Sequence, residues 1–166
     1  MNPIERHRIV MDQFAIGHEW QKYAAAFFEL NGLPVHVPEL EVRQAPSTDP
    51  YENERGDLWI GDILLDVKTT FVRFTYPGDF KYPAPMVDTV HGFETKAERP
   101  RVYVVVSRPM GTMMWISVKE SFDYWIRQRK YDTVMQTDRT FFLCDKKWWH
   151  PIDELVATLK AELKIN

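Results

Sequence analysis

Cysteine is nearly absent from this chain, since Cys144 is the only one among 166 residues. A single cysteine excludes an internal disulfide and a cysteine-rich zinc site. Cys144 ends the apolar stretch at residues 140–144, and a free cysteine in such surroundings is usually a small buried hydrophobe. We therefore expect Cys144 to lie in the core and to have no role as a nucleophile.

The chain also lacks a long apolar run and a large net charge. No segment of about 18 apolar residues occurs, and residues 1–8 lack the apolar segment of a secretory signal. We therefore expect a soluble, cytoplasmic protein that does not bind membranes. The net charge of −3 argues against a surface that coats polyanions broadly. A nucleic-acid enzyme remains compatible with this charge if acids gather at a metal site and basic residues elsewhere meet phosphates.

Length and composition favour one domain. With 45% hydrophobic and 14% aromatic residues, the 166 residues are enough for one well-buried core. The sequence contains no repeats and no low-complexity segments. We expect a single α/β domain that spans residues 1–166.

Two apolar runs, at residues 58–60 and 63–70, are joined by Gly61-Asp62. Their large and β-branched side chains, together with a turn that contains glycine, predict a β-hairpin. A two-residue turn would pair Ile60 with Ile63, Trp59 with Leu64, Leu58 with Leu65, and Asp57 with Asp66.

Two carboxylates, those of Asp57 and Asp66, face each other in this register. Directly opposed Cβ atoms are about 5 Å apart, where like charges repel, and a bound cation would remove the repulsion. Because side chains alternate along a strand, Asp66 and Lys68 share one face with Leu64. The hairpin should therefore have a charged face and an apolar face, the latter made of Ile63, Leu65 and Val67.

The other segments show helix and strand patterns. Residues 12–31 have helical spacing with an apolar stripe made of Ile16, Trp20, Tyr23, Ala24, Phe27 and Leu30. We expect further helices at 121–130, from residue 150 onward, and within 87–97. Strands are expected at 35–42, 101–107, 112–118 and 140–144, with a continuation of the hairpin strand through 71–74. Residues 76–100 are too long for plain loop, and the sequence does not decide their role.

The tripeptide acid-x-Lys occurs five times in the chain, so by itself it identifies no site. Asp66-Val67-Lys68 differs from the others because Asp66 interrupts an apolar strand, Asp57 faces it, and Glu19 lies on an upstream helix. A carboxylate among apolar side chains is costly unless it is paired. Asp66 therefore needs a partner, which is either a bound cation or an ordinary cross-strand charge cluster.

In these residues the chain resembles the PD-(D/E)xK nuclease superfamily. The matching features are Glu19 on the first helix, Asp57 at the start of a strand, and Asp66-Val67-Lys68 on the next strand. The resemblance implies a restriction-endonuclease-like fold, which is a mixed central β-sheet flanked by helices. It covers about the first seventy residues by motif and the later elements by their order.

The resemblance also implies hydrolysis of phosphodiester bonds with Mg²⁺, for which Mn²⁺ is a substitute. Asp57, Asp66 and the Val67 carbonyl would ligate the metal, and hard oxygen ligands of this kind suit magnesium. Lys68 would position the attacking water or help to deprotonate it. Glu19 would bind the metal through water or orient Lys68, although acids on a helix flank are mostly solvated.

Further residues are weaker candidates for contacts with nucleic acid. Thr69 and Thr70 would donate hydrogen bonds to a phosphate, or are ordinary strand residues. Arg127, Arg129 and Lys130 would form a phosphate patch, or suit the end of a helix whose dipole favours cations.

We expect a nuclease that acts on DNA in preference to RNA. The alternative is a non-catalytic nucleic-acid-binding or assembly protein that keeps the nuclease fold, and a third reading is an unrelated fold with a structural charge cluster. The presence of Glu19, Asp57, Asp66 and Lys68 favours the enzyme. A homodimer remains open, since small nucleases that cut both strands often pair.

Overall fold

The structure, a computed structural model, describes residues 1–39 and 58–166. Asp57 and the predicted strand beyond residue 39 lie outside these ranges. The helices are α1 (Pro3–Leu30), α2 (Val90–Thr95), α3 (Val118–Ser121) and α4 (Ile152–Glu162), and 3₁₀ turns cover η1 (Pro77–Asp79), η2 (Phe122–Tyr124) and η3 (Lys146–Trp148). The strands are β1 (Val35–His36), β2 (Leu58–Ile60), β3 (Ile63–Thr70), β4 (Met86–Thr89), β5 (Val102–Ser107), β6 (Met113–Ser117), β7 (Ile126–Asp132), β8 (Thr137–Leu143) and β9 (His150–Pro151).

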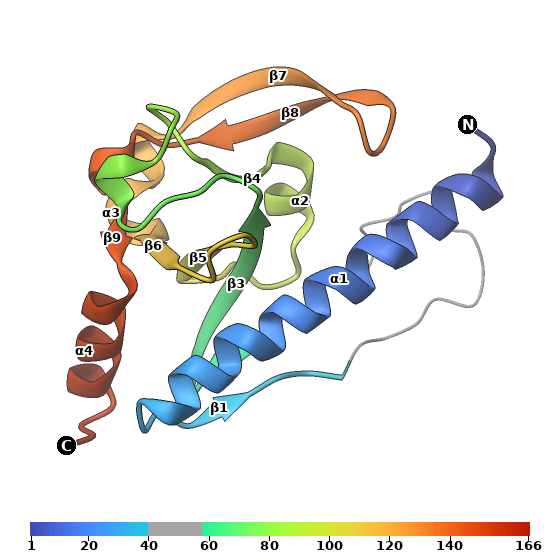
Figure 1. Ribbon diagram of the computed structural model, residues 1–166. Helices are drawn as coiled ribbons and strands as arrows, with labels where there is room; N and C mark the ends of the chain where they lie inside the picture. Colours follow the sequence, from blue (N-terminus) through green and yellow to red (C-terminus); the bar gives the residue numbers. More distant parts are fainter. Residues whose placement is uncertain (40–57) are drawn as a thin grey trace.

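A mixed sheet in the order β1-β2-β3-β5-β6-β9 forms the centre of the fold (Figure 1). β3 and β5 run parallel, and the other neighbouring strands are antiparallel. Every residue of β5 is buried, as its unbroken apolar run predicts for a central strand. The predicted α/β class with a mixed sheet is therefore confirmed.

The hairpin of β2 and β3 has the predicted register, with the pairs Leu58–Leu65, Trp59–Leu64 and Ile60–Ile63. Gly61 takes the first position of its two-residue turn with a φ of +59°, as a type II′ turn demands. Its amide donates to the Pro34 carbonyl at 3.0 Å. The predicted pair of Asp57 and Asp66 lies one step beyond the described part of this ladder.

Two separate layers cover the two faces of the six-stranded sheet. α1 and α4 cover one face through a buried cluster that includes Ala24, Phe28, Leu65, Val67, Leu155 and Leu159. A second, antiparallel sheet in the order β4-β8-β7 covers the other face together with α2. Its buried cluster includes Val87, Phe93, Tyr103, Val105 and Phe142. The sheet is therefore flanked by helices on one face and mainly by a smaller sheet on the other.

The first helix is longer than predicted and turns a different stripe to the core. α1 begins at Pro3, where the Asn2 side chain accepts from the Glu5 amide at 2.8 Å. Figure 1 shows α1 extending well past β3 toward its N-terminus, so only part of the helix can cover the sheet. The predicted stripe is partly wrong, because Ile16, Tyr23 and Leu30 are exposed, whereas the buried residues are Val10, Ala24, Ala25 and Phe28.

The helix predicted at residues 121–130 is wrong. In this range the only helical residues belong to the end of the short α3 and to η2. From residue 126 onward β7 pairs along its whole length with β8. Pairing with the next strand of the hairpin overrides a local sequence pattern that suits a helix. The predicted continuation of the hairpin strand through 71–74 is also wrong, since β3 ends at Thr70.

The strand predicted at 35–42 is present only as the short β1 at Val35–His36 within the described residues, and the other elements agree with the predicted positions. α2 lies within 87–97, β6 within 112–118, β8 overlaps 140–144, and α4 begins just after residue 150. Cys144 is fully buried in the cluster beneath the second sheet, as predicted. Among the described residues, no helix is long and apolar enough to span a membrane.

Gly61→Ala should lower the free energy of unfolding by about 1–2 kcal/mol, because a side chain is strained at this positive φ. The added Cβ would also lie 3.0 Å from Leu163 Cδ2. Gly17→Ala is the control, since a Cβ there meets nothing within 4 Å, and alanine in a helix should stabilise by up to about 1 kcal/mol. Urea denaturation measures both values, and effects of the same sign would contradict this account of the turn.

Candidate functional site

Asp66 lies in the middle of β3 and is 1% exposed. It is the register partner of Tyr103 on the parallel strand β5, and its side chain shares a face with that of Lys68. Its neighbours Leu65 and Val67 belong to the opposite face, in the cluster beneath α1 and α4. The predicted division of β3 into a charged and an apolar face is confirmed.

Four side chains, those of Asp66, Lys68, Asp88 and Lys96, form a charge cluster on this face. The Lys68 Nζ atom lies 3.2 Å from Asp66 Oδ1 and 3.4 Å from Asp88 Oδ1. The Lys96 Nζ atom lies 2.9 Å from Asp66 Oδ2 and 3.7 Å from Asp88 Oδ2. Each lysine therefore bridges both carboxylates, and the four formal charges sum to zero.

The charge cluster is largely shielded from solvent. The side chains of Asp66, Asp88 and Lys96 are 1–5% exposed, whereas that of Lys68 is 26% exposed. A buried ion without a partner costs several kcal/mol, so the mutual pairing is a condition for this face to fold. Lys68 is the member of the cluster with the most access to solvent.

The segment from β4 to the end of α2 supplies half of the charge cluster. Asp88 lies in β4, and its Oδ1 accepts from the Thr89 amide at 2.8 Å. Thr89 in turn caps α2 by accepting from the Gly92 amide at 3.0 Å. Lys96 caps the other end of the helix, and the Tyr103 hydroxyl donates to Asp88 Oδ2 at 2.7 Å. β4 and the short helix that follows it therefore place an acid and a lysine beside Asp66.

The sequence prediction missed Asp88, Lys96 and Tyr103. A signal for Asp88 was present, because it interrupts the apolar and β-branched run at residues 86–90, as Asp66 interrupts its own strand. Lys96 belongs to another of the acid-x-Lys tripeptides, Glu94-Thr95-Lys96. Both residues lie in 76–100, the region whose role the sequence leaves open, and this region completes the charge cluster.

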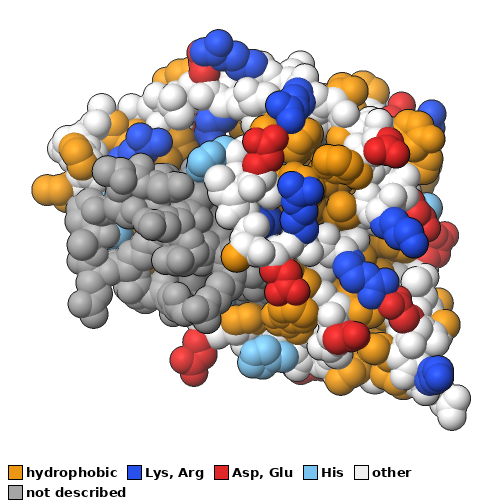
Figure 2. Space-filling model, turned by 180° about the vertical axis from the view of Figure 1, so that it is seen from behind, with side chains coloured by type: hydrophobic (Ala, Val, Ile, Leu, Met, Phe, Trp, Pro, Cys, Tyr) orange, Lys and Arg blue, Asp and Glu red, His pale blue; other side chains and the backbone are white. Residues whose placement is uncertain are grey.

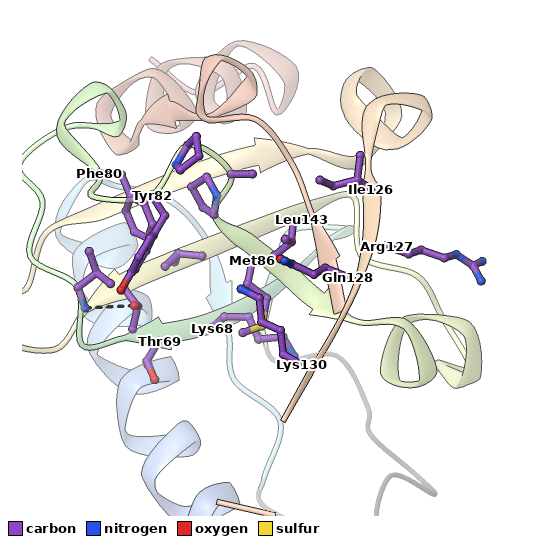
Figure 3. Close-up of a pocket in the computed structure, with 16 residues that line it drawn as sticks. Lys68, Thr69, Phe80, Tyr82, Met86, Ile126, Arg127, Gln128, Lys130 and Leu143 are labelled. Atoms are coloured by element: carbon purple, nitrogen blue, oxygen red, sulfur yellow. Dashed lines mark hydrogen bonds between the residues drawn. The ribbon is translucent and has the colours of Figure 1, made fainter. Parts of the chain in front are cut away.

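Lys68 also borders a cavity of about 660 Å³, which we call the Lys68 cavity. The cavity is lined by the end of β3, residues 80 and 82–86, and the beginning of β7 (Figure 3). Thr69 and Thr70 also line it. The Thr69 hydroxyl oxygen accepts from Arg108 Nε at 2.9 Å, and that of Thr70 accepts from the Val72 amide at 3.2 Å.

The basic residues predicted to form one phosphate patch are divided between the two faces of β7. Because side chains alternate along a strand, Arg127 and Arg129 lie opposite Lys130. Arg127 pairs with Glu94 at 3.0 Å, and Arg129 pairs with Asp138 at 2.9 Å. Lys130 lines the Lys68 cavity and forms no ion pair with any residue that the structure describes.

Glu19 and Asp57 are the remaining predicted site residues. The Glu19 side chain is 72% exposed on α1 and pairs with Lys22 at 3.3 Å, so it occupies a solvated position and is not a member of the charge cluster. Asp57 lies outside the described residues. Its pairing with Asp66 and its role as a metal ligand stay predictions.

Positive and negative side chains are mixed on one face of the molecule. On the face that Figure 2 shows, Lys and Arg side chains alternate with Asp and Glu side chains and with apolar ones. This distribution agrees with the net charge of −3. The described residues on this face form no broad positive surface that could coat a polyanion.

Asp66 and Asp88 supply the hard oxygen donors that Mg²⁺ prefers. Among the described residues, no three His, Cys, Asp or Glu side chains gather into a metal-binding group. A magnesium ion bound to Asp66 would therefore need donors of another kind or from outside those residues. The Val67 carbonyl and Asp57 are the predicted ones, and binding of magnesium at Asp66 stays a prediction.

Comparison of the chain with protein-family models, with curated proteins and with solved structures finds no match. No family is therefore shown for this chain. Its function has to be inferred from the charge cluster and from the cavity beside it.

Lys96→Met should lower the free energy of unfolding by about 3–5 kcal/mol, because Lys68 would then be the one lysine paired with two buried carboxylates. Arg129→Met is the control, since it breaks an ion pair whose side chains are 75% and 50% exposed. Its cost should stay below about 1 kcal/mol. Urea denaturation of both variants gives the comparison. Equal losses would show that burial does not set the strength of the cluster.

Burial raises the pKa of the Cys144 thiol to about 11, so the thiolate is scarce at pH 8. A thiol-specific disulfide reagent should therefore react with the folded protein at least about a hundredfold more slowly than with the protein in 8 M urea. Absorbance of the released thiolate measures both rates. Similar rates would contradict the buried, non-nucleophilic role of Cys144.

Proposed function

We propose that this chain is a magnesium-dependent nuclease of the PD-(D/E)xK type, which hydrolyses phosphodiester bonds in DNA in preference to RNA. The observation that carries the proposal is the geometry of Asp66 and Lys68, a buried acid and a partly exposed lysine 3.2 Å apart on a central strand. Lys68 borders a cavity, which gives a substrate access to the lysine. The mixed sheet, with α1 and α4 on one face, supports a restriction-endonuclease-like fold.

In this proposal Asp66, the Val67 carbonyl and Asp57 hold the magnesium ion. When bound there, the metal would make a water nucleophilic and stabilise the charge that grows on the phosphate. Asp66 is suited to this task because β3 is held on both sides by neighbouring strands. A ligand on such a strand keeps its orientation better than a ligand on a loop.

Lys68 is the residue that we propose to contact the reacting phosphate or the attacking water. Its ammonium group is positioned by two carboxylates, at 3.2 and 3.4 Å, and it borders the cavity where a substrate would enter. An ammonium group with fixed partners is preorganised to stabilise negative charge that develops in the transition state.

Lys96 and Tyr103 act as positioning residues in this proposal. Lys96 pairs with both carboxylates but does not line the cavity, so it continues to neutralise them when Lys68 turns toward a phosphate. The Tyr103 hydroxyl holds Asp88 through its Oδ2. The two residues together keep the acids paired and oriented while Lys68 serves the substrate.

A non-catalytic nucleic-acid-binding protein with the same fold is the second candidate. One observation favours it, because Lys68 and Lys96 already neutralise both described carboxylates of the cluster. The cluster would then stabilise the fold and hold no metal. Binding of nucleic acid without cleavage under any metal condition would support this candidate over the nuclease.

Asp66→Asn and Lys68→Ala should each reduce magnesium-dependent cleavage by about a hundredfold or more, because each removes a group that acts on the transition state. The substrates are linear, circular, single-stranded and branched DNA together with RNA, each with Mg²⁺, Mn²⁺ or a chelator. Gel electrophoresis measures cleavage, and circular dichroism confirms that each variant is folded.

Lys147→Ala is the matched control for this experiment. Lys147 belongs to another acid-x-Lys tripeptide, Asp145-Lys146-Lys147, and is exposed, so the substitution should leave cleavage unchanged. Full activity of the Asp66→Asn and Lys68→Ala variants would contradict the proposed site. Cleavage by the unmodified protein that persists in chelator would contradict the role of the metal.

A further inference from the structure

The Lys68 cavity has walls of two different kinds. Phe80 and Tyr82 form an aromatic side, and the beginning of β7 forms a polar side with Gln128 and Lys130 (Figure 3). Lys68 lies between them at the end of β3. The cavity therefore places an aromatic ring and a second lysine on opposite sides of the proposed catalytic lysine.

The charged side chains that line the cavity are all basic, although the chain as a whole is negative. Its charged residues are Lys68, Arg127 and Lys130, and none of the described residues that line it is acidic. The Arg127 side chain points away in Figure 3 and pairs with Glu94. Lys68 and Lys130 are thus the two cations that a ligand in the cavity would meet.

The hairpin of β7 and β8 stands out from the body of the molecule as an arm (Figure 1). Six of the seven residues of β7 are exposed, whereas a strand that covers a core buries one face. Ile126, Gln128 and Lys130 share the face that lines the cavity. The arm therefore leaves one strand face available to a ligand in the Lys68 cavity.

We propose that the Lys68 cavity binds the unpaired nucleotides of a single nucleic-acid strand, with a base on Tyr82 and phosphates between Lys68 and Lys130. Aromatic rings beside a cationic groove are the means by which proteins bind single strands. Tyr82 is 51% exposed, so its ring is open to stacking. This inference rests on the proposed function and adds the form of the substrate.

The size of the cavity argues for a single strand over a duplex. Pockets of roughly 300–1,000 Å³ hold ligands of small-molecule size, and about 660 Å³ corresponds to a few unpaired nucleotides at most. A duplex substrate would therefore have to present a free end, a flap or an opened strand.

Binding without cleavage tests the inference separately from the proposed function. Fluorescence anisotropy in chelator compares a labelled single-stranded DNA of twelve nucleotides, the same sequence in RNA, and a blunt duplex. The single strands should bind at least about tenfold more tightly than the duplex, and the DNA and RNA arms show which of the two is preferred. Equal or tighter binding of the blunt duplex would overturn the inference.

Lys130→Gln should weaken single-strand binding about fivefold and reduce the slope of log affinity against log salt by about one, because one phosphate contact is lost. Arg129→Gln is the matched control, since it removes the same charge from the next residue on the opposite face of β7. Its effect should stay below about twofold. Equal effects of the two substitutions would contradict the inference.

Tyr82→Ala should weaken binding about tenfold with no change in the salt dependence, because stacking is lost and no charge is removed. Tyr131→Ala, on the far face of the arm and 61% exposed, should have little effect. If strand binding persists but no cleavage occurs with any metal, the proposed function fails and this inference stands. If cleavage occurs but the Lys130 and Tyr82 variants bind normally, the inference alone fails.

Discussion

Two carboxylates buried on one face of a sheet need two cations, and most of the structure around β3 meets this need. Asp66 is fixed by its position in a central strand, so its partners must come to it. β4 brings Asp88, the C-terminal cap of α2 brings Lys96, and β5 brings the Tyr103 hydroxyl. Because the cost of leaving any one of these charges unpaired is several kcal/mol, the second sheet and the central sheet have to assemble as one unit on this face.

The parts of the fold that local rules govern could be predicted from the sequence. The register of the β2–β3 hairpin follows from a two-residue turn that contains glycine and from the alternation of side chains. The burial of β5 and of Cys144 follows from unbroken apolar runs. The helix predicted at 121–130 failed for the opposite reason, since β7 exists because β8 pairs with it, and no periodicity within those ten residues shows that partner.

Half of the charge cluster could not be predicted for a similar reason. Asp66 and Lys68 are two residues apart on one strand, so alternation alone places them on one face. Lys96 is far from Asp66 and Lys68 along the chain. Its position beside them depends on where α2 ends and on how β4 pairs with β8 in the second sheet. The acid-x-Lys pattern does not show which of the two lysines is buried. In the structure Lys68 is partly exposed and reaches the cavity, whereas Lys96 is buried inside the cluster.

The pairing register of β3 has one more consequence, for the accuracy of folding. A slip of one residue against β2 would exchange the two faces of the strand. Asp66 and Lys68 would then lie beneath α1 and α4 among apolar side chains such as Phe28 and Leu155, where neither Asp88 nor Lys96 could reach them. Charges that are paired on the correct face would make the slipped strand prohibitively unstable. Asp66 and Lys68 therefore help to specify a single pairing register for β3.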